Sequence, residues 1–146
     1  MPPFKRDEVP MQSANRNSKV LIIEDDRHMN NVLTRVIQKK TCHDVTSCFF
    51  LKEGLNMAVK GSYDVILLDV LMPDGNGLDS LGAILSVETD PEIIVLTGRP
   101  DSDSARKAIG MGAFDYLSKP GSMANILFHL HGAISRRECR KKNTDR

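Results

Sequence analysis

Short, unbroken apolar runs alternate along this chain with longer segments in which apolar residues recur every three or four positions. The unbroken runs predict five strands, at about 19–24, 44–48, 63–69, 92–97 and 113–117. The run Val65–Leu68 contains no polar residue, which indicates a strand that is buried on both faces, as the strands of a parallel sheet are.

The segments between these runs have the periodicity of helices that bury one face. The pattern is clearest after the first run, where one helix face collects Met29, Val32, Leu33, Val36 and Ile37. Further helices are predicted at 51–59, 78–85, 101–111 and 123–134. The helix at 101–111 has the weakest apolar stripe, so we expect its packing to shift most easily.

Strand and helix alternate five times, and this alternation determines the expected fold class. Parallel neighbours need crossover connections, and these are right-handed, so helices must cover both faces of the sheet. The sequence therefore predicts a single doubly wound, three-layer α/β domain at residues 19–137. We expect residues 1–18 to form a mobile N-terminal lead-in and residues 138–146 to form a basic C-terminal tail or linker.

Four of the apolar runs end in polar residues that suit phosphate chemistry. These residues are Glu24-Asp25, Asp69, Thr97 and Lys119. The carboxyl ends of parallel strands share one edge of a sheet, and open α/β sheets place their active sites at that edge, where the strand order reverses. Carboxylates bind Mg²⁺ and can attack phosphorus, while a hydroxyl and an ammonium group can hold phosphoryl oxygens.

Each of these residues also has an ordinary structural interpretation. The acidic run after the first strand could cap the next helix, for which Asp26 is well placed. Asp69 precedes a Pro/Gly turn and could be a turn residue. Thr97 suits a strand end, Lys119 could be a plain surface lysine, and Tyr116 could be packing. Their shared position at the ends of the central strands favours one common site over separate roles.

Together these residues form a signature that resembles one protein family. The signature consists of Glu24-Asp25, Asp69 followed by Met72-Pro73-Asp74-Gly75, Thr97-Gly98, Tyr116 and Lys119-Pro120. It resembles the CheY-like receiver domain of response regulators in two-component signalling, over roughly residues 19–137. Residues 72–79 and 119–123 further resemble the receivers of sigma-54-type, NtrC-like transcriptional activators. The resemblance implies a flavodoxin-like (βα)5 fold with a five-stranded parallel sheet of order 2-1-3-4-5.

The resemblance also implies a phosphoacceptor and a metal site. Asp69 would accept a phosphoryl group from a sensor histidine kinase or a phosphotransfer protein. Asp25, Asp69 and the backbone carbonyl of Leu71 would hold Mg²⁺, and Glu24 would act through a metal-bound water.

The remaining site residues would transmit the signal. Thr97 and Lys119 would bind phosphoryl oxygens, and Thr97 would relay the change together with Tyr116. The relay would alter the surface formed by helix 101–111, strand 113–117 and helix 123–134, and so regulate transcription through an effector domain or a partner protein. The same surface is a candidate for homodimer formation. Such a protein is a signalling switch rather than an enzyme, because it catalyses only its own phosphorylation and dephosphorylation.

Three other classes of protein share parts of this pattern. The main alternative is a pseudo-receiver, an interaction module that no longer takes phosphate, but such domains usually lack one of the acids or the lysine. A haloacid-dehalogenase-like phosphatase needs a second aspartate two residues after the nucleophile, where this chain has Leu71. A flavin-binding protein of similar fold would have to place a flavin phosphate in an acidic crevice that repels it.

Charge and composition bear on partners and compartment. The net charge of +1 creates no field that would attract nucleic acid to this domain. The six Lys/Arg against two Asp/Glu from Arg136 onward are expected to form cationic helix turns and a linker. No apolar run approaches the ~20 residues of a membrane span, so no membrane partner is expected. Three cysteines without metal-ligand spacing suit free thiols in a reducing compartment, which predicts a cytoplasmic protein.

Overall fold

The computed structural model describes residues 17–119 and 123–145, so most of the expected lead-in at 1–18 lies outside the described residues. The main sheet of this described part contains β1 (Lys19–Ile23), β2 (Asp44–Cys48), β3 (Val65–Asp69), β6 (Glu92–Thr97) and β7 (Asp115–Ser118). The helices are α2 (Arg27–Lys40), α3 (Leu51–Lys60), α4 (Gly77–Leu85), α5 (Ser102–Met111) and α6 (Met123–Asp145). A small hairpin that the sequence did not predict, β4 (Leu71–Met72) with β5 (Gly75–Asn76), follows β3.

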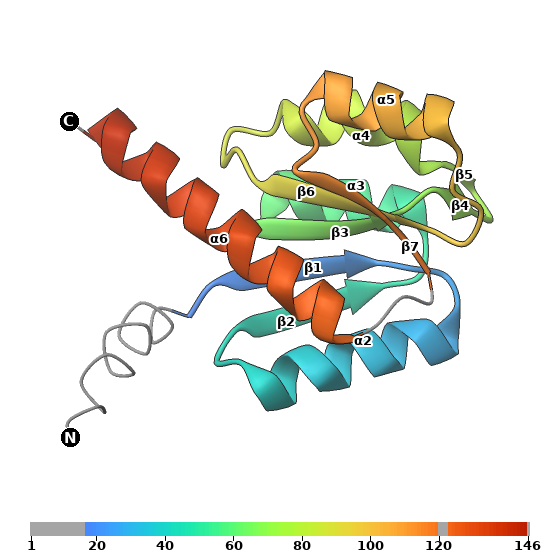
Figure 1. Ribbon diagram of the computed structural model, residues 1–146, viewed down its shortest axis with the longest axis horizontal. Helices are drawn as coiled ribbons and strands as arrows, with labels where there is room; N and C mark the ends of the chain where they lie inside the picture. Colours follow the sequence, from blue (N-terminus) through green and yellow to red (C-terminus); the bar gives the residue numbers. More distant parts are fainter. Residues whose placement is uncertain (1–16, 120–122, 146) are drawn as a thin grey trace.

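The main sheet is parallel throughout and has the order β2-β1-β3-β6-β7. When the hairpin is set aside, this is the predicted order 2-1-3-4-5, so the doubly wound, flavodoxin-like fold is confirmed. Helices α2 and α6 cover one face of the sheet, and α3, α4 and α5 cover the other (Figure 1).

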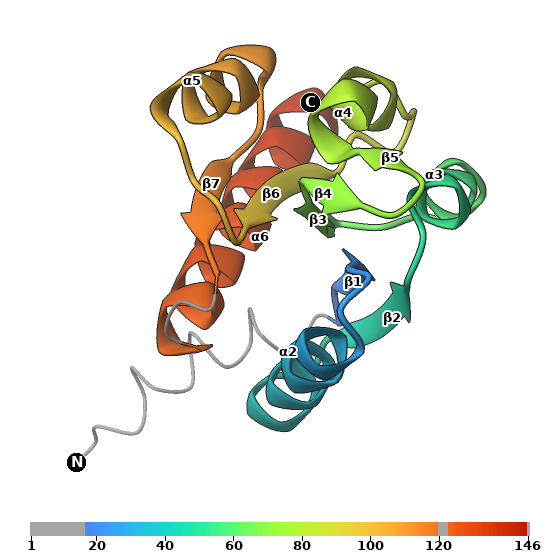
Figure 2. The same ribbon diagram turned by 90° about the vertical axis from the view of Figure 1, so that its right-hand side faces the viewer.

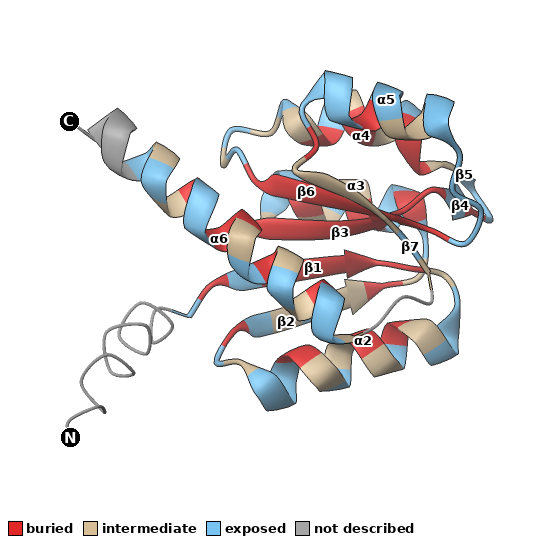
Figure 3. Ribbon diagram, viewed as in Figure 1, coloured by how far each residue is buried: buried red, intermediate tan, exposed pale blue. Residues whose placement is uncertain are grey.

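The unbroken apolar runs form the central strands because successive side chains of a strand point to opposite faces, and both faces are covered here. In β1, Leu21 packs into the layer that contains Leu81 of α4, whereas Ile22 packs into the layer that contains Leu33 of α2. All four side chains are fully buried. Strands β1, β3 and β6 are buried nearly throughout, while the edge strands are more exposed (Figure 3).

Helix α6 continues past residue 137, where the domain was expected to end. It runs to Asp145, so residues 138–145 continue the same helix. Arg137 donates from Nη2 to the carbonyl of Thr89 at 2.6 Å, and Arg140 donates from Nε to Asp90 at 2.8 Å. These arginines hold α6 against the turn before β6. A further role as a linker stays a prediction. Neither α6 nor any other helix of the described residues is long and apolar enough to cross a membrane.

Candidate functional site

The carboxyl ends of β1 and β3 meet where the strand order reverses, since β1 leads outward to β2 and β3 leads to β6 (Figure 2). Glu24 and Asp25 follow β1 directly, and Asp69 ends β3. One carboxylate oxygen of each residue lies within 4.8 Å of the other two. The convergence follows from the parallel register, which pairs Ile23 with Leu68 and so brings the two strand ends level.

Two of these three carboxylates are removed from water. Glu24 is 1% exposed and Asp69 is 4% exposed, whereas Asp25 is the most exposed of the three. The backbone N–H of Asp26 donates to Glu24 Oε2 at 3.0 Å, and Asp26 itself caps α2 by accepting from the N–H of Met29 at 3.1 Å. The acidic run therefore divides between two tasks, because Asp26 caps the helix while Glu24 and Asp25 join the cluster.

Lys119 reaches this cluster from the end of β7. Its ammonium nitrogen lies 2.7 Å from Glu24 Oε1 and 3.1 Å from Asp69 Oδ2. The lysine backbone is held as well, because its N–H donates to the carbonyl of Thr97 at 2.7 Å. The structure thus brings together the predicted acids and the predicted lysine, which come from the ends of three different strands.

Burial and like charge make Asp69 an unusually weak acid. Burial of the carboxyl, followed by the neighbouring Glu24, raises the pKa of Asp69 from 3.8 to about 7, although Lys119 acts in the opposite direction. Burial also disfavours the charged form of Lys119, but its contacts with Glu24 and Asp69 outweigh this effect and raise its pKa. Among the described residues, the Lys119 ammonium contacts two of the three clustered acids, and a further cation would balance the remaining negative charge.

The donor set of the cluster suits a hard divalent cation. Mg²⁺ prefers oxygen ligands, takes few of them from protein and keeps several waters. Glu24, Asp25 and Asp69 offer three carboxylate oxygens close together, and a cation between them would relieve their repulsion. The residues present therefore fit the predicted Mg²⁺ site. The fourth predicted ligand, the carbonyl of Leu71, belongs to β4, two residues after Asp69.

Backbone contacts hold the loop after Asp69 at its base. The N–H of Val70 donates to the carbonyl of Leu96 at 3.1 Å, and the N–H of Gly77 donates to the carbonyl of Val70 at 2.6 Å. A Cβ atom at Gly77 would lie 2.2 Å from the carbonyl oxygen of Asp69, so this close approach requires glycine. The side chain of Leu71, in contrast, is largely exposed.

The hydroxyls of Thr97 and Tyr116 are hydrogen-bonded to the loop between β6 and α5. Thr97 is buried, and its hydroxyl accepts from the N–H of Arg99 at 3.1 Å. The hydroxyl of Tyr116 accepts from the N–H of Asp101 at 3.4 Å. Both predicted switch residues therefore contact the same loop, and their roles in phosphate binding and relay stay predictions.

Two residues near the site had not been identified as functional from the sequence. The side-chain amide of buried Asn30 donates to the carbonyls of Glu24 and Cys48, at 3.0 and 3.2 Å, and so ties the ends of β1 and β2 together. Asp74 accepts from two backbone N–H groups at the start of α3, at 2.8 and 2.9 Å. The sequence does contain a signal for each residue. Asn30 lies on the apolar face of its helix, and α3 is preceded by Phe50, which has no side-chain oxygen to cap the helix, so another residue must do so.

Comparison with known proteins agrees with this geometry. The family model of the response regulator receiver domain matches residues 20–131. The transcriptional regulatory protein YcbL of Bacillus subtilis is 31% identical over 116 residues, which are 80% of this chain and 50% of that protein. The DNA-binding transcriptional regulator NtrC of Azospirillum brasilense is 32% identical over 116 residues, which are 80% of this chain and 24% of that protein. The chain thus spans half or less of the length of these two relatives.

A solved structure extends the likeness to three dimensions. The beryllofluoride-activated receiver domain dimer of NtrC4 is 29% identical with a TM-score of 0.76, and the match covers 82% of this chain and 98% of that chain. The shared fold therefore comprises nearly the whole of a receiver domain. Together with the family match and the acidic cluster at the switch point of the sheet, this shows that the chain belongs to the response regulator receiver domain family.

Proposed function

We propose that this chain is a phosphorylation-dependent switch of a two-component system, in which Asp69 accepts a phosphoryl group from a sensor histidine kinase or a phosphotransfer protein. The proposal is carried by one observation, the contact of the Lys119 ammonium with Asp69 at 3.1 Å inside a buried acidic cluster. A buried carboxylate supplies a nucleophile, and the ammonium supplies a counter-charge for phosphoryl oxygens.

In the proposed reaction, an oxygen of ionised Asp69 attacks the phosphorus of a phosphohistidine. The phosphorus–nitrogen bond breaks, and the imidazole nitrogen keeps the electron pair and takes a proton from water. The product is an acyl phosphate on Asp69. Lys119 would then hold a phosphoryl oxygen. Asp25, Asp69 and the Leu71 carbonyl would hold Mg²⁺ directly, and Glu24 would hold it through a water. The bound ion would supply the positive charge that lets a phosphoryl dianion approach the acids.

The switch would begin at Thr97, because a phosphoryl group adds about two negative charges at the neighbouring strand end. The hydroxyl of Thr97 would give up its hydrogen bond with the N–H of Arg99 and bind a phosphoryl oxygen. Tyr116 would then give up its hydrogen bond with the N–H of Asp101 and fill the space that Thr97 vacates. Helix α5 should respond most, since Ala108 is its one buried residue among those described. The surface of α5, β7 and α6 would thus follow a two-state equilibrium biased by local charge.

We further propose that this surface regulates transcription through an effector domain or a partner protein. YcbL and NtrC are transcriptional regulators by name, and each is longer than the matched region. The resemblance of the receiver portion supports the same kind of output here.

Intact mass measurement after incubation with acetyl phosphate and Mg²⁺ tests the phosphoacceptor. We expect the parent protein to gain one phosphoryl group and Asp69→Asn to gain none. Asp44→Asn removes an exposed carboxylate at the opposite end of the sheet and should label like the parent. A parent that gains no mass would favour the pseudo-receiver, and full labelling of Asp69→Asn would place the nucleophile elsewhere.

A further inference from the structure

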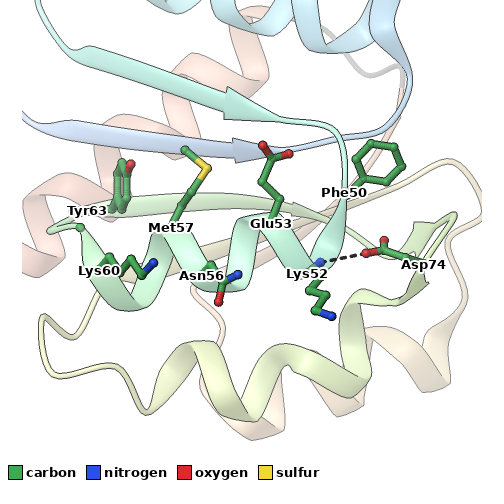
Figure 4. A pocket seen from close by; sticks show the side chains of 9 residues that line it. Phe50, Lys52, Glu53, Asn56, Met57, Lys60, Tyr63 and Asp74 are labelled. Atoms are coloured by element: carbon green, nitrogen blue, oxygen red, sulfur yellow. Dashed lines mark hydrogen bonds between the residues drawn. The ribbon is translucent and has the colours of Figure 1, made fainter.

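Helix α3 lacks a cap from its own sequence. It begins at Leu51, and the preceding Phe50 makes no side-chain capping hydrogen bond. The first N–H groups of a helix have no partner within the helix and need an acceptor. Here Asp74 provides it, because Oδ1 accepts from the N–H of Leu51 at 2.8 Å and Oδ2 accepts from the N–H of Lys52 at 2.9 Å. Figure 4 shows Asp74 facing the start of α3, with its hydrogen bond to Lys52 drawn.

Asp74 also belongs to the hairpin that follows the nucleophile. Leu71 pairs with Asn76 and Met72 pairs with Gly75, so Asp74 lies at the tip of this hairpin. Strands of two residues have little stability of their own. The hairpin is held at its base by the N–H of Val70 on the carbonyl of Leu96 and along its length by buried Met72. Its tip is held by the two contacts of Asp74 with α3.

We propose that Asp74 is a positioning residue for the divalent cation. This role rests on the proposed function. The hydrogen bonds of Asp74 to the start of α3 would fix the hairpin, and with it the Leu71 carbonyl, beside the carboxylates of Asp25 and Asp69. Among the described residues, the carboxylates that converge are those of Glu24, Asp25 and Asp69, so Asp74 would act on the ion indirectly. Residues that orient metal ligands without touching the metal often change affinity when they are replaced. Binding of Mg²⁺ and hydrogen bonding at the start of α3 are then thermodynamically coupled, and such coupling acts equally in both directions.

A weaker Mg²⁺ affinity in an Asp74 variant could also result from the lost negative charge alone or from the general loss of a helix cap. Four variants separate these two explanations from the positioning role. Asp74→Ala removes both hydrogen bonds and one negative charge, while Asp74→Asn removes the charge but keeps one oxygen acceptor. Glu53→Gln removes a carboxylate from the first turn of the same helix and leaves the hydrogen-bonding groups of Asp74, Leu51 and Lys52 unchanged. The side chain of Asp101 caps α5 by accepting from the N–H of Ser104. Asp101→Ala removes this comparable cap and so controls for the general loss of a helix cap.

The decisive measurement is calorimetric titration of each folded variant with Mg²⁺ alone. We expect Asp74→Ala to weaken Mg²⁺ affinity on the order of tenfold, and Asp74→Asn to recover part of that loss. Glu53→Gln and Asp101→Ala should bind Mg²⁺ like the parent. Equal affinity of Asp74→Ala and parent would overturn the inference, as would an equal loss in Glu53→Gln, which would make the effect one of charge alone.

Amide hydrogen exchange gives a second readout that a purely local cap would not move. We expect Mg²⁺ to slow exchange at the amides of Leu51 and Lys52 in the parent and to leave them unchanged in Asp74→Ala. If Mg²⁺ leaves the exchange rates of these two amides unchanged in the parent, the coupling between the metal site and α3 is refuted. A parent that binds no Mg²⁺ would instead refute the metal site of the proposed function, and this inference with it.

Discussion

Lys119 and Glu24 are 95 positions apart in the sequence, yet the ammonium nitrogen of the lysine lies 2.7 Å from Oε1 of the glutamate. The contact joins the end of an edge strand to the end of a central strand. It is largely shielded from water, because the lysine side chain is 15% exposed and the glutamate side chain 1%. Such a pair depends on both partners, since removal of one leaves the charge of the other buried.

Lys119→Met should therefore destabilise the metal-free protein by about 3 kcal/mol near pH 8. Glu24 and Asp69 would lose their counter-charge, and added Mg²⁺ should restore part of the loss. Urea unfolding with and without Mg²⁺ measures both effects. Lys107→Met, which removes an exposed pair with Asp79, is the control and should cost less than about 1 kcal/mol. If both variants lose equally little stability, the buried pair is not a stabilising feature.

The metal-free protein should lose stability relative to Asp69→Asn as pH rises. Burial and Glu24 raise the pKa of Asp69 from 3.8 to about 7, so between these values the folded protein keeps a proton that the unfolded chain releases. The stabilisation from this proton is complete below pH 3.8 and is lost as pH rises through about 7. Urea unfolding in the presence of a chelator at several pH values gives the comparison. Parallel profiles for the two proteins would contradict the prediction.

Asp25→Ala should abolish Mg²⁺ binding and yet stabilise the metal-free protein. Removing one of three like-charged carboxylates relieves repulsion in the cluster, while the cation loses a ligand. Because Asp25 is the most exposed of the three acids, the gain should be modest, about 0.5 kcal/mol. Thermal unfolding without metal and titration with Mg²⁺ test the two parts. A less stable variant that still titrates normally would rule this out.

Leu71→Asn should shorten the lifetime of the phosphorylated form. Hydrolysis requires a water in line with phosphorus, and an apolar side chain two residues past the nucleophile cannot orient one. An asparagine at this exposed position could do so, whereas Leu71→Met, the matched control, could not. Loss of the added mass over time measures the decay. The idea should be dropped if Leu71→Asn decays no faster than the parent.

Beryllofluoride, a phosphoryl mimic, should alter the face of α5, β7 and α6. Helix α5 buries only Ala108 among its residues, so its amides should change hydrogen exchange more than those of α2, which buries three residues. Sedimentation should show whether a homodimer forms through this face, where Phe128 and Ile109 are exposed. Identical mass and identical exchange in both states would count against an output surface here.

The sequence by itself determined the five strands of the main sheet, the five helices and the acids and lysine that end strands at the candidate site. Unbroken runs such as Val65–Leu68 indicated a strand buried on both faces, and the one-sided stripe through Leu33 and Ile37 indicated a helix packed on one side. These patterns depend on residues that are neighbours along the chain. The position of Asp69 at a strand end followed from the same local pattern, together with the rule that parallel strands end at one edge.

Tertiary structure alone decided which groups meet. It brought Lys119 to Glu24, gave α3 a cap from Asp74, and tied two strand ends together through Asn30. It also extended α6 past residue 137, where Arg140 finds its partner before β6. A helix or strand depends on local periodicity, which can be read along the chain. A cap or a buried ion pair depends on the register and order of strands far apart in sequence, which only the packed fold establishes.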